Sequence, residues 1–209
     1  MDQSFSPITL SQKSLLEGIA YLAKIDTDIA KVIFDLGNPP LWSREPGFPT
    51  MIHIILEQQV SLASARAAFI KLEESVGQLT PERFLELTDG ELKGIGFSKQ
   101  KTVYGRELSK AILKGELDLG ELSSLDDPSA RNNLMKIKGI GPWTADIYLL
   151  MALLRPDIWP SGDLALAKAA QKIKNLSSIP TPEVLDEIAV QWVPWRAVAA
   201  RILWHYYLN

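Results

Sequence analysis

The stretch KIKGIGPWTAD, residues 136–146, has the residue types and spacing of an anion-binding turn. Apolar residues at helical spacing end near Ile137, two glycines flank one apolar residue, and Pro142 stands where a following helix would begin. The first turn of such a helix has backbone N–H groups without intrahelical partners, and these groups bind anions such as phosphate. The Gly-x-Gly spacing alone favours an ordinary turn between two helices.

A second candidate for chemistry is Asp163, the last residue of the loop RPDIWPSGD at 155–163. A lone carboxylate in such a position is more often a helix N-cap, and a helix is expected at 164–174 directly after it. Two more carboxylates lie nearby in sequence, and we interpret Asp146 as a helix-surface residue and Asp157 as a loop residue. Residue types alone therefore leave both capping and catalysis open for Asp163.

The tetrapeptide KGIG occurs a second time, at 93–96, where it precedes a basic stretch expected to be helical at 98–114. We interpret this copy as a plain turn between helices. The only acidic residue opposing the basic side chains is Glu107, so either a solvated helix face or an electrostatic contact surface is expected. The basic residues are Lys93, Lys99, Lys101, Arg106, Lys110 and Lys114.

Composition limits the classes of function. The chain has 209 residues, 46% of them hydrophobic, which is enough to bury a core. The absence of cysteine excludes disulfides, cysteine-type zinc sites and cysteine-ligated iron–sulfur clusters. A net charge of −3 argues against a non-specific nucleic-acid binder. Neither a signal-peptide pattern nor an apolar run of about 20 residues is seen, so we expect a cytoplasmic protein.

The chain is expected to be all-α, with about ten helices. The segment 51–76 has apolar residues at helical spacing, and Thr88 with Glu91 fits a capping box. The proline-rich stretch 38–49 is the clearest break and is expected to link two helical layers. Three further pairs indicate an N-cap residue followed by proline at the first helical position: Thr80-Pro81, Asp127-Pro128 and Thr181-Pro182.

The longer pattern L-x-x-I-x-G-I-G-x-W-T-A, which begins at Leu134, resembles the helix-hairpin-helix of the HhH-GPD superfamily of DNA glycosylases. Three further segments are similar to the AlkA-type branch, DNA-3-methyladenine glycosylase II: ILEQQVSLASA (55–65), LKGIGFSKQKTVYGRELSKAI (92–112) and VPWRAVAARILWHYY (193–207). They lie in the expected order, and the resemblance covers the chain from about residue 45 to the end. About 45 residues precede this core, too few for the additional β-containing domain of the best-known member.

The resemblance implies a two-lobed, all-α HhH-GPD glycosylase fold with the lesion cleft between the lobes. We expect one glycosylase unit over residues 1–209. One lobe is expected at about 46–149 and contains the helix-hairpin-helix at 134–149; the other combines 1–45 with 150–209.

The resemblance also implies that Asp163 is the essential aspartate that follows the hairpin. An anion there would stabilise the positive charge that develops on the sugar, or orient or deprotonate the attacking water; both roles stay open. An N3- or N7-alkylated purine is already cationic and leaves without a second carboxyl group as acid. Trp143 stands where the strand-cleaving branch has a lysine, so no Schiff base is expected and the product is an abasic site.

The expected base pocket suits a flipped-out cationic base. Aromatic walls attract such a base by cation–π contacts of about 0.5–2 kcal/mol each. We expect core packing for Trp192 and Trp195, and a packed or surface role for His205. The resemblance and the sequence place four residues at the pocket: Trp143, Trp204, Ile147 and, from the linker, Trp42.

Duplex DNA containing alkylated bases is the expected partner of a monomer. Backbone N–H groups of Gly139, Gly141 and Thr144 are expected to hold a phosphate, with Lys138 beside them. The position of the family's intercalating leucine is Gln59 here, with its neighbour Gln58 as the alternative. No cofactor is required; the family's hairpin binds sodium or potassium through carbonyls that correspond to Met135, Ile137 and Ile140.

Two alternatives remain at this level. One keeps the fold but acts on uracil, mismatches or oxidised purines, which the pair Trp143 and Trp204 disfavours. The other is a helix-hairpin-helix module that only binds DNA, which the presence of Asp163 at the expected distance along the chain disfavours.

Overall fold

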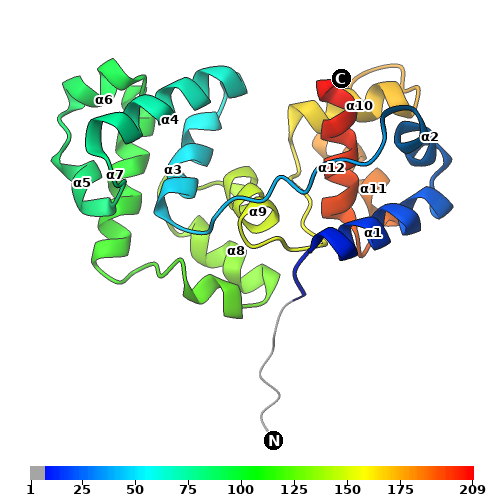
Figure 1. Cartoon of the computed structure of the whole chain (residues 1–209), viewed down its shortest axis with the longest axis horizontal. Coiled ribbons are helices and arrows are strands. Elements are labelled where there is room, and N and C mark those ends of the chain that lie inside the picture. Colours follow the sequence, from blue (N-terminus) through cyan, green and yellow to red (C-terminus); the bar gives the residue numbers. More distant parts are fainter. Residues whose placement is uncertain (1–7) are drawn as a thin grey trace, which may run out of the picture. The chain divides into compact units, whose positions relative to one another are not determined.

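The computed structural model describes residues 8–209 and is all-α, as predicted: within this range it has twelve α-helices, two 3₁₀ helices and no strand (Figure 1). The described residues divide into two compact units, one over 44–148 and the other over 8–43 with 149–209. None of the described helices is long and apolar enough to cross a membrane.

The 44–148 unit is built around α7 (Lys99–Leu113), against which α3 (Phe48–Glu57) and α5 (Pro81–Glu86) pack. Helix α4 (Leu62–Val76) packs on α3, and α6 (Asp89–Ile95) contacts both α4 and α7. The chain continues through a 3₁₀ turn and α8 into the greater part of α9. Those last elements are η1 (Glu121–Ser124), α8 (Asp127–Met135) and α9 (Pro142–Met151).

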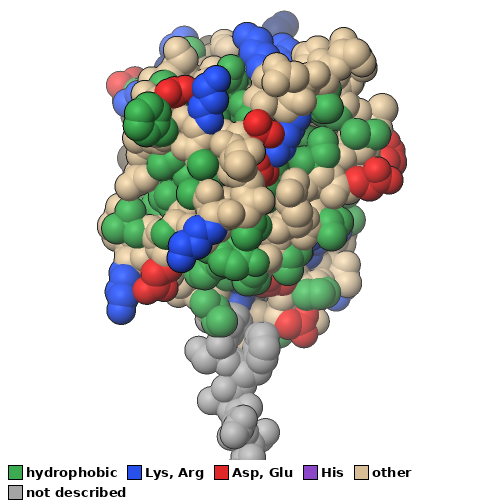
Figure 2. Space-filling view, turned by 90° about the vertical axis from the view of Figure 1, so that its right-hand side faces the viewer, with side chains coloured by type: hydrophobic (Ala, Val, Ile, Leu, Met, Phe, Trp, Pro, Cys, Tyr) green, Lys and Arg blue, Asp and Glu red, His purple; other side chains and the backbone are tan. Residues whose placement is uncertain are grey.

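The second unit is centred on α12 (Arg196–Leu208), whose residues 197–204 are all buried. Helices α1 (Gln12–Ile25), α2 (Thr27–Leu36) and α10 (Leu164–Ile173) pack against α12. The remaining elements are α11 (Pro182–Ala189) and η2 (Val190–Trp192). On the face shown in Figure 2, basic, acidic and apolar side chains alternate and no charge of one sign dominates.

A buried carboxylate links three elements of this second unit. Asp26 is 5% exposed, caps α2, and accepts hydrogen bonds from Lys174 at 2.6 and 2.7 Å. The indole of Trp192, fully buried as its predicted core role requires, donates to the same carboxylate at 2.8 Å. Trp195 is half-buried and packs against Gly18 of α1, where a side chain larger than hydrogen would collide with its ring.

Most of the predicted helix starts are confirmed. Thr80 and Thr181 cap α5 and α11, each with proline at the first turn, and Thr88 forms the predicted capping box with Glu91. The third pair is one residue off: α8 is capped by Asp126, which accepts from the Ser129 amide at 2.7 Å. Pro128 is tolerated as the second residue of the helix because an N–H at that position would have no intrahelical acceptor, so a residue without one loses no hydrogen bond.

The helical spacing over 51–76 hides an interruption. Helix α3 ends at Glu57, the backbone turns through Gln58 and Gln59, and α4 starts after its cap at Ser61. Gln59 has φ +56°, a left-handed conformation that residues with a side chain rarely adopt.

Candidate functional site

The predicted hairpin is present between α8 and α9. The turn at 136–141 contains both glycines, and the Gly141 carbonyl accepts the first bond of α9 from the Ala145 amide at 3.0 Å. The interpretation of Asp146 as a surface residue is wrong: it is 2% exposed and accepts two hydrogen bonds from Arg131, at 2.7 and 3.0 Å. This bidentate pair stabilises the packing of the two helices of the hairpin.

The two glycines of the hairpin have different surroundings. Gly139 has φ +96°, and a Cβ there would overlap the ring of Tyr104 on α7. Gly141 has neither constraint: its φ lies outside the left-handed region, and a Cβ would meet nothing within 4 Å. The fold itself therefore requires glycine at 139 but leaves open space at 141. Lys138, between Ile137 and Gly139, is exposed.

Gln58 binds the hairpin rather than solvent. Its Nε2 donates to the Gly139 carbonyl at 3.0 Å and to Oγ1 of Thr144 at 2.9 Å, and Thr144 is 2% exposed. Its neighbour Gln59 is exposed. Of the two predicted wedge residues, Gln58 is therefore tied to the hairpin, and Gln59 is the one with an exposed side chain.

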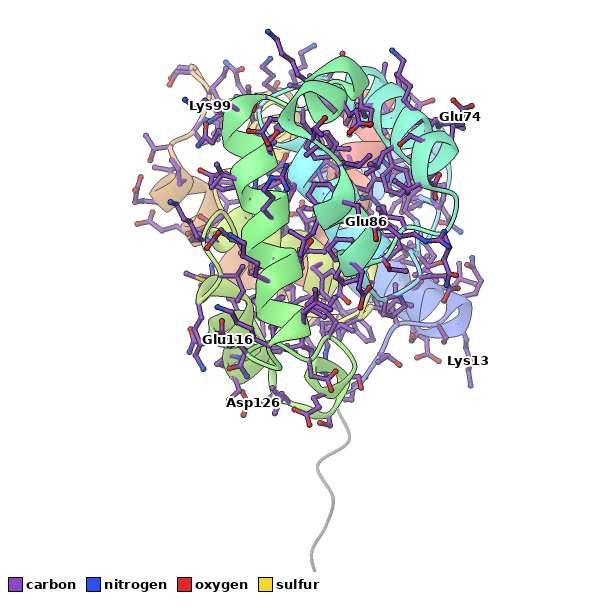
Figure 3. The ribbon with its side chains drawn as sticks, turned by 90° about the vertical axis from the view of Figure 1, so that its left-hand side faces the viewer. Lys13, Glu74, Glu86, Lys99, Glu116 and Asp126 are labelled. Atoms are coloured by element: carbon purple, nitrogen blue, oxygen red, sulfur yellow. The ribbon has the colours of Figure 1, made fainter. Side chains whose placement is uncertain are left out.

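The basic stretch is not a uniform solvated face. Lys99 lies at the beginning of α7 and Glu116 just beyond its end (Figure 3). Lys101 is 8% exposed and donates to the Leu56 carbonyl at 2.7 Å; burial lowers the pKa of its ammonium group. Arg106 donates to the carbonyl of residue 87 at 2.8 Å and to Asp89 at 2.7 Å. These two cations therefore stabilise the fold.

The first KGIG copy is a plain turn, as interpreted from the sequence. It ends α6, and Gly96 at its end has φ +126°.

Asp163 is held at the start of α10 in the second unit. It is 8% exposed, and its Oδ1 accepts from the Leu166 amide at 3.0 Å, which confirms the capping role. The same oxygen accepts from Nε1 of Trp204 at 3.3 Å. Trp204 is itself 8% exposed on α12, so the structure brings the predicted catalytic residue into direct contact with one of the four predicted pocket residues.

The loop that precedes Asp163 is fixed by side chains that the sequence did not reveal. Asp186 on α11 accepts from the indole of Trp159 at 3.1 Å and from the hydroxyl of Ser161 at 2.9 Å. Asp157, a loop residue as interpreted, accepts two bonds from the Arg196 guanidinium at 2.9 and 2.7 Å. The loop therefore enters α10 in one defined conformation.

The buried Arg201 fixes the linker that carries Trp42. Its guanidinium donates to the carbonyls of Leu41, Ala197 and Leu150 at 2.8, 2.9 and 2.8 Å. Burial lowers the pKa of Arg201 to about 10. Trp42 is half-buried, with φ +49° and its ring centroid 6.3 Å from that of His205. A packed role for His205 fits its contact with the Leu36 carbonyl at 3.1 Å.

The other predicted pocket residues belong to α9. Trp143 is half-buried and Ile147 is 3% exposed, both in the 44–148 unit, whereas Trp42, Trp204 and Asp163 belong to the second unit. Among the described residues no group of three or more His, Asp and Glu side chains is placed to hold a metal ion.

The two helical units, one with a helix-hairpin-helix and the other with a buried aspartate at a helix start, agree with the class of base excision glycosylases. Residues 52–195 match the family described as the HhH-GPD superfamily base excision DNA repair protein. The match covers more than half of the chain, which therefore belongs to this superfamily.

Individual relatives agree with this assignment. The chain is 28% identical over 186 residues to YfjP of Bacillus subtilis and 30% identical over 162 residues to DNA-3-methyladenine glycosylase of the same species. These alignments cover 85% and 72% of this chain, but only 65% and 54% of the relatives. The structure of Schizosaccharomyces pombe 3-methyladenine DNA glycosylase (Mag1) in complex with abasic DNA is similar, with a TM-score of 0.85, 26% identity and coverage of 90% of this chain and 95% of that one.

Proposed function

We propose that the chain is a monofunctional DNA glycosylase that excises alkylated purines, such as 3-methyladenine and 7-methylguanine, from duplex DNA and leaves an abasic site. The observation that carries the proposal is the Asp163 carboxylate, which is 8% exposed and oriented by an amide and an indole. The names of the Bacillus subtilis and Schizosaccharomyces pombe relatives support 3-methyladenine as a substrate.

The proposed chemistry needs only one carboxylate. The target base is flipped out of the duplex, and positive charge develops on its sugar as the N-glycosidic bond breaks. An anion held in place before the reaction stabilises that charge without reorganising during the step. Because the alkylated base is already cationic, it departs without a general acid, and water completes the hydrolysis at the sugar carbon. Trp143 offers no amine for a covalent intermediate with the sugar.

Duplex DNA is the proposed partner, bound at the hairpin. Gly141 directly precedes α9, and the first N–H groups of a helix have no intrahelical acceptor. A Cβ at Gly141 would meet nothing within 4 Å, and this open space supports a phosphate site there. The exposed Lys138 adds positive charge beside this turn. The solved complex of Mag1 with abasic DNA supports the same class of partner.

Sodium or potassium is proposed as a structural ion at the end of α8. The carbonyls of Met135, Ile137 and Ile140 are hard oxygen ligands, and carbonyls that follow the last turn of a helix have no intrahelical donor. The Ile137 carbonyl keeps a lone pair for an ion although it accepts from the Ile140 amide at 3.0 Å. The ion would stabilise the turn and take no part in the reaction.

The decisive test is release of free base from methylated duplex DNA by the wild type and by Asp163→Asn. Asparagine caps a helix as well as aspartate and can accept from the same amide and indole, so this variant removes charge while keeping the cap. We expect the wild type alone to release 3-methyladenine or 7-methylguanine, with strands broken only after alkali, and both proteins to bind the duplex equally.

Other outcomes would change the proposal in defined ways. Equal release by both proteins would contradict the role of Asp163. No release by either protein, with tight duplex binding by both, would point to another lesion class, and then to a binding module if a panel of lesions also gave none. Strand breakage without alkali would contradict the monofunctional assignment.

A further inference from the structure

The corner between α3 and α4 holds an exposed residue in a conformation that needs support. Gln59 has φ +56°, which residues with a Cβ adopt only where their surroundings determine it. Its own side chain is exposed. The residues before it are each held in place by other parts of the unit.

Three consecutive residues before Gln59 are each held by a different part of the 44–148 unit. The Leu56 carbonyl accepts from the buried ammonium group of Lys101 at 2.7 Å. The Glu57 carboxylate, 9% exposed, accepts two bonds from Arg44 at 2.7 and 3.0 Å. The third residue, Gln58, is the one whose side chain reaches the hairpin.

The Gln58 amide joins the two segments through one nitrogen. Its two N–H groups are divided between the Gly139 carbonyl in the turn and the Thr144 hydroxyl in the first turn of α9. Gly139 cannot shift easily, because it is packed against the Tyr104 ring, and Thr144 is 2% exposed. The position of the corner is therefore tied to the rigid part of the hairpin rather than to a mobile side chain.

We propose that Gln58 is a positioning residue that couples the hairpin to the corner at Gln59, so that both contact the duplex as one rigid surface. This inference rests on the proposed function, because the duplex is the shared partner. A side chain that fills the space left by a flipped base must be held at a fixed distance from the phosphates that the hairpin grips. A link that exists before binding removes the entropy cost of ordering the corner on the DNA.

The test is a double-mutant cycle read by binding rather than by base release. The ratio of affinities for a duplex containing a tetrahydrofuran abasic-site analogue and for the intact duplex is measured for wild type, Gln58→Met, Gln59→Ala and the double variant. Methionine has nearly the same length as glutamine but donates no hydrogen bond. Two lost hydrogen bonds are expected to lower the ratio about fivefold to tenfold.

The coupling predicts a specific pattern within this cycle. Gln59→Ala is expected to lower the ratio about as much as Gln58→Met, and the double variant no further, because both changes remove one effect. The thermal midpoint of Gln58→Met is expected to fall, because the Gly139 carbonyl and the buried Thr144 hydroxyl lose their donor. The readout is therefore the ratio of the two affinities rather than either affinity alone. Thr144→Val removes one of the two acceptors from the hairpin side and should give an intermediate loss.

Several results would overturn the coupling. Additive losses in the double variant would show that Gln58 acts independently of Gln59. An equal loss of affinity for both duplexes in Gln58→Met would show that it only supports the hairpin, and an unchanged ratio would show that the link has no effect. Equal affinity of the wild type for the two duplexes would also contradict the coupling, because the corner at Gln59 would then make no contribution that Gln58 could support.

Failure of the coupling is distinguishable from failure of the proposed function. A non-additive cycle in a protein that releases no alkylated base would support the coupling and contradict the proposed activity on alkylated purines. Base release that depends on Asp163, together with an additive cycle, would support the assignment and contradict the coupling.

Discussion

Replacing Gly139 and Gly141 by alanine, one at a time, separates a glycine that the fold needs from a glycine that a ligand needs. At Gly139, φ +96° costs an alanine about 1–3 kcal/mol. Overlap of its Cβ with the Tyr104 ring adds about 1–3 kcal/mol. A loss of about 4 kcal/mol corresponds to a fall of roughly 8–16 °C in Tm for a chain of this size.

At Gly141 the expected cost to stability is small. A Cβ would meet nothing within 4 Å, and the backbone is not left-handed. Alanine is a poorer residue than glycine immediately before a helix, so we expect a loss of at most about 1 kcal/mol. The new methyl group would stand where the proposed phosphate approaches the first turn of α9, and we expect duplex affinity to fall about tenfold.

Thermal unfolding by circular dichroism and duplex binding by fluorescence anisotropy at one fixed salt concentration measure the two effects. Gly94→Ala is the matched control: this glycine lies inside α6 in the first KGIG copy, and a Cβ there also meets nothing within 4 Å. Alanine should stabilise that helix slightly and leave duplex affinity unchanged. A Gly141→Ala variant that binds the duplex like the wild type would refute the phosphate site, and a Gly139→Ala variant as stable as the wild type would refute the steric argument.

Three further predictions concern the second unit. Trp204→Phe keeps an aromatic ring but removes the donor 3.3 Å from Asp163, so single-turnover base release should slow about tenfold with little change in Tm. Asp186→Ala frees the loop before Asp163 and should lower the rate of release more than duplex affinity, whereas Asp186→Asn keeps an acceptor and should lose less. Burial raises the pKa of Asp26, but hydrogen bonds led by that from Lys174 outweigh it and the pKa is lowered. The stability that this carboxylate contributes is complete at pH values above its ordinary pKa of 3.8 and is lost as the pH falls below that value. Denaturant titrations from about pH 6 down to about pH 2 should show this loss in the wild type but not in Asp26→Asn.

Local signals in the sequence predicted the helical architecture and the hairpin. Thr80 and Thr181 cap their helices because each hydroxyl accepts from a backbone amide three residues later, and the intervening proline needs no acceptor. All of these groups lie within a few positions of one another in the sequence. The turn between two helices at 136–141 is predictable for the same reason, since two glycines and Pro142 act within a single turn. Its interpretation as a helix-hairpin-helix depends on the longer pattern and its resemblance to the superfamily. The N-cap is Asp126 rather than the predicted Asp127. Two adjacent aspartates can each act as the cap, because proline is accepted at either the first or the second position of the helix.

The contacts that support the candidate site were not predictable, because their partners are distant in sequence. Gln58 and Gly139 are 81 positions apart, and Trp159 and Asp186 are 27 apart. The burial of Lys101 depends on an acceptor 45 positions away on α3, which no count of charges along α7 reveals. Residue types identified the groups able to do chemistry, and tertiary packing decided which of them are tied to the fold.

The two roles considered for Asp163 support each other. As the N-cap of α10 it accepts from the Leu166 amide, and the positive end of the helix dipole favours a negative charge at this position. The same cap fixes the direction of the carboxylate, which the bond from Trp204 fixes again. A carboxylate that is to stabilise a cationic sugar must be immobile before the base leaves. In the proposed reaction the cap supplies this condition, so capping is a requirement of the chemistry rather than an alternative to it.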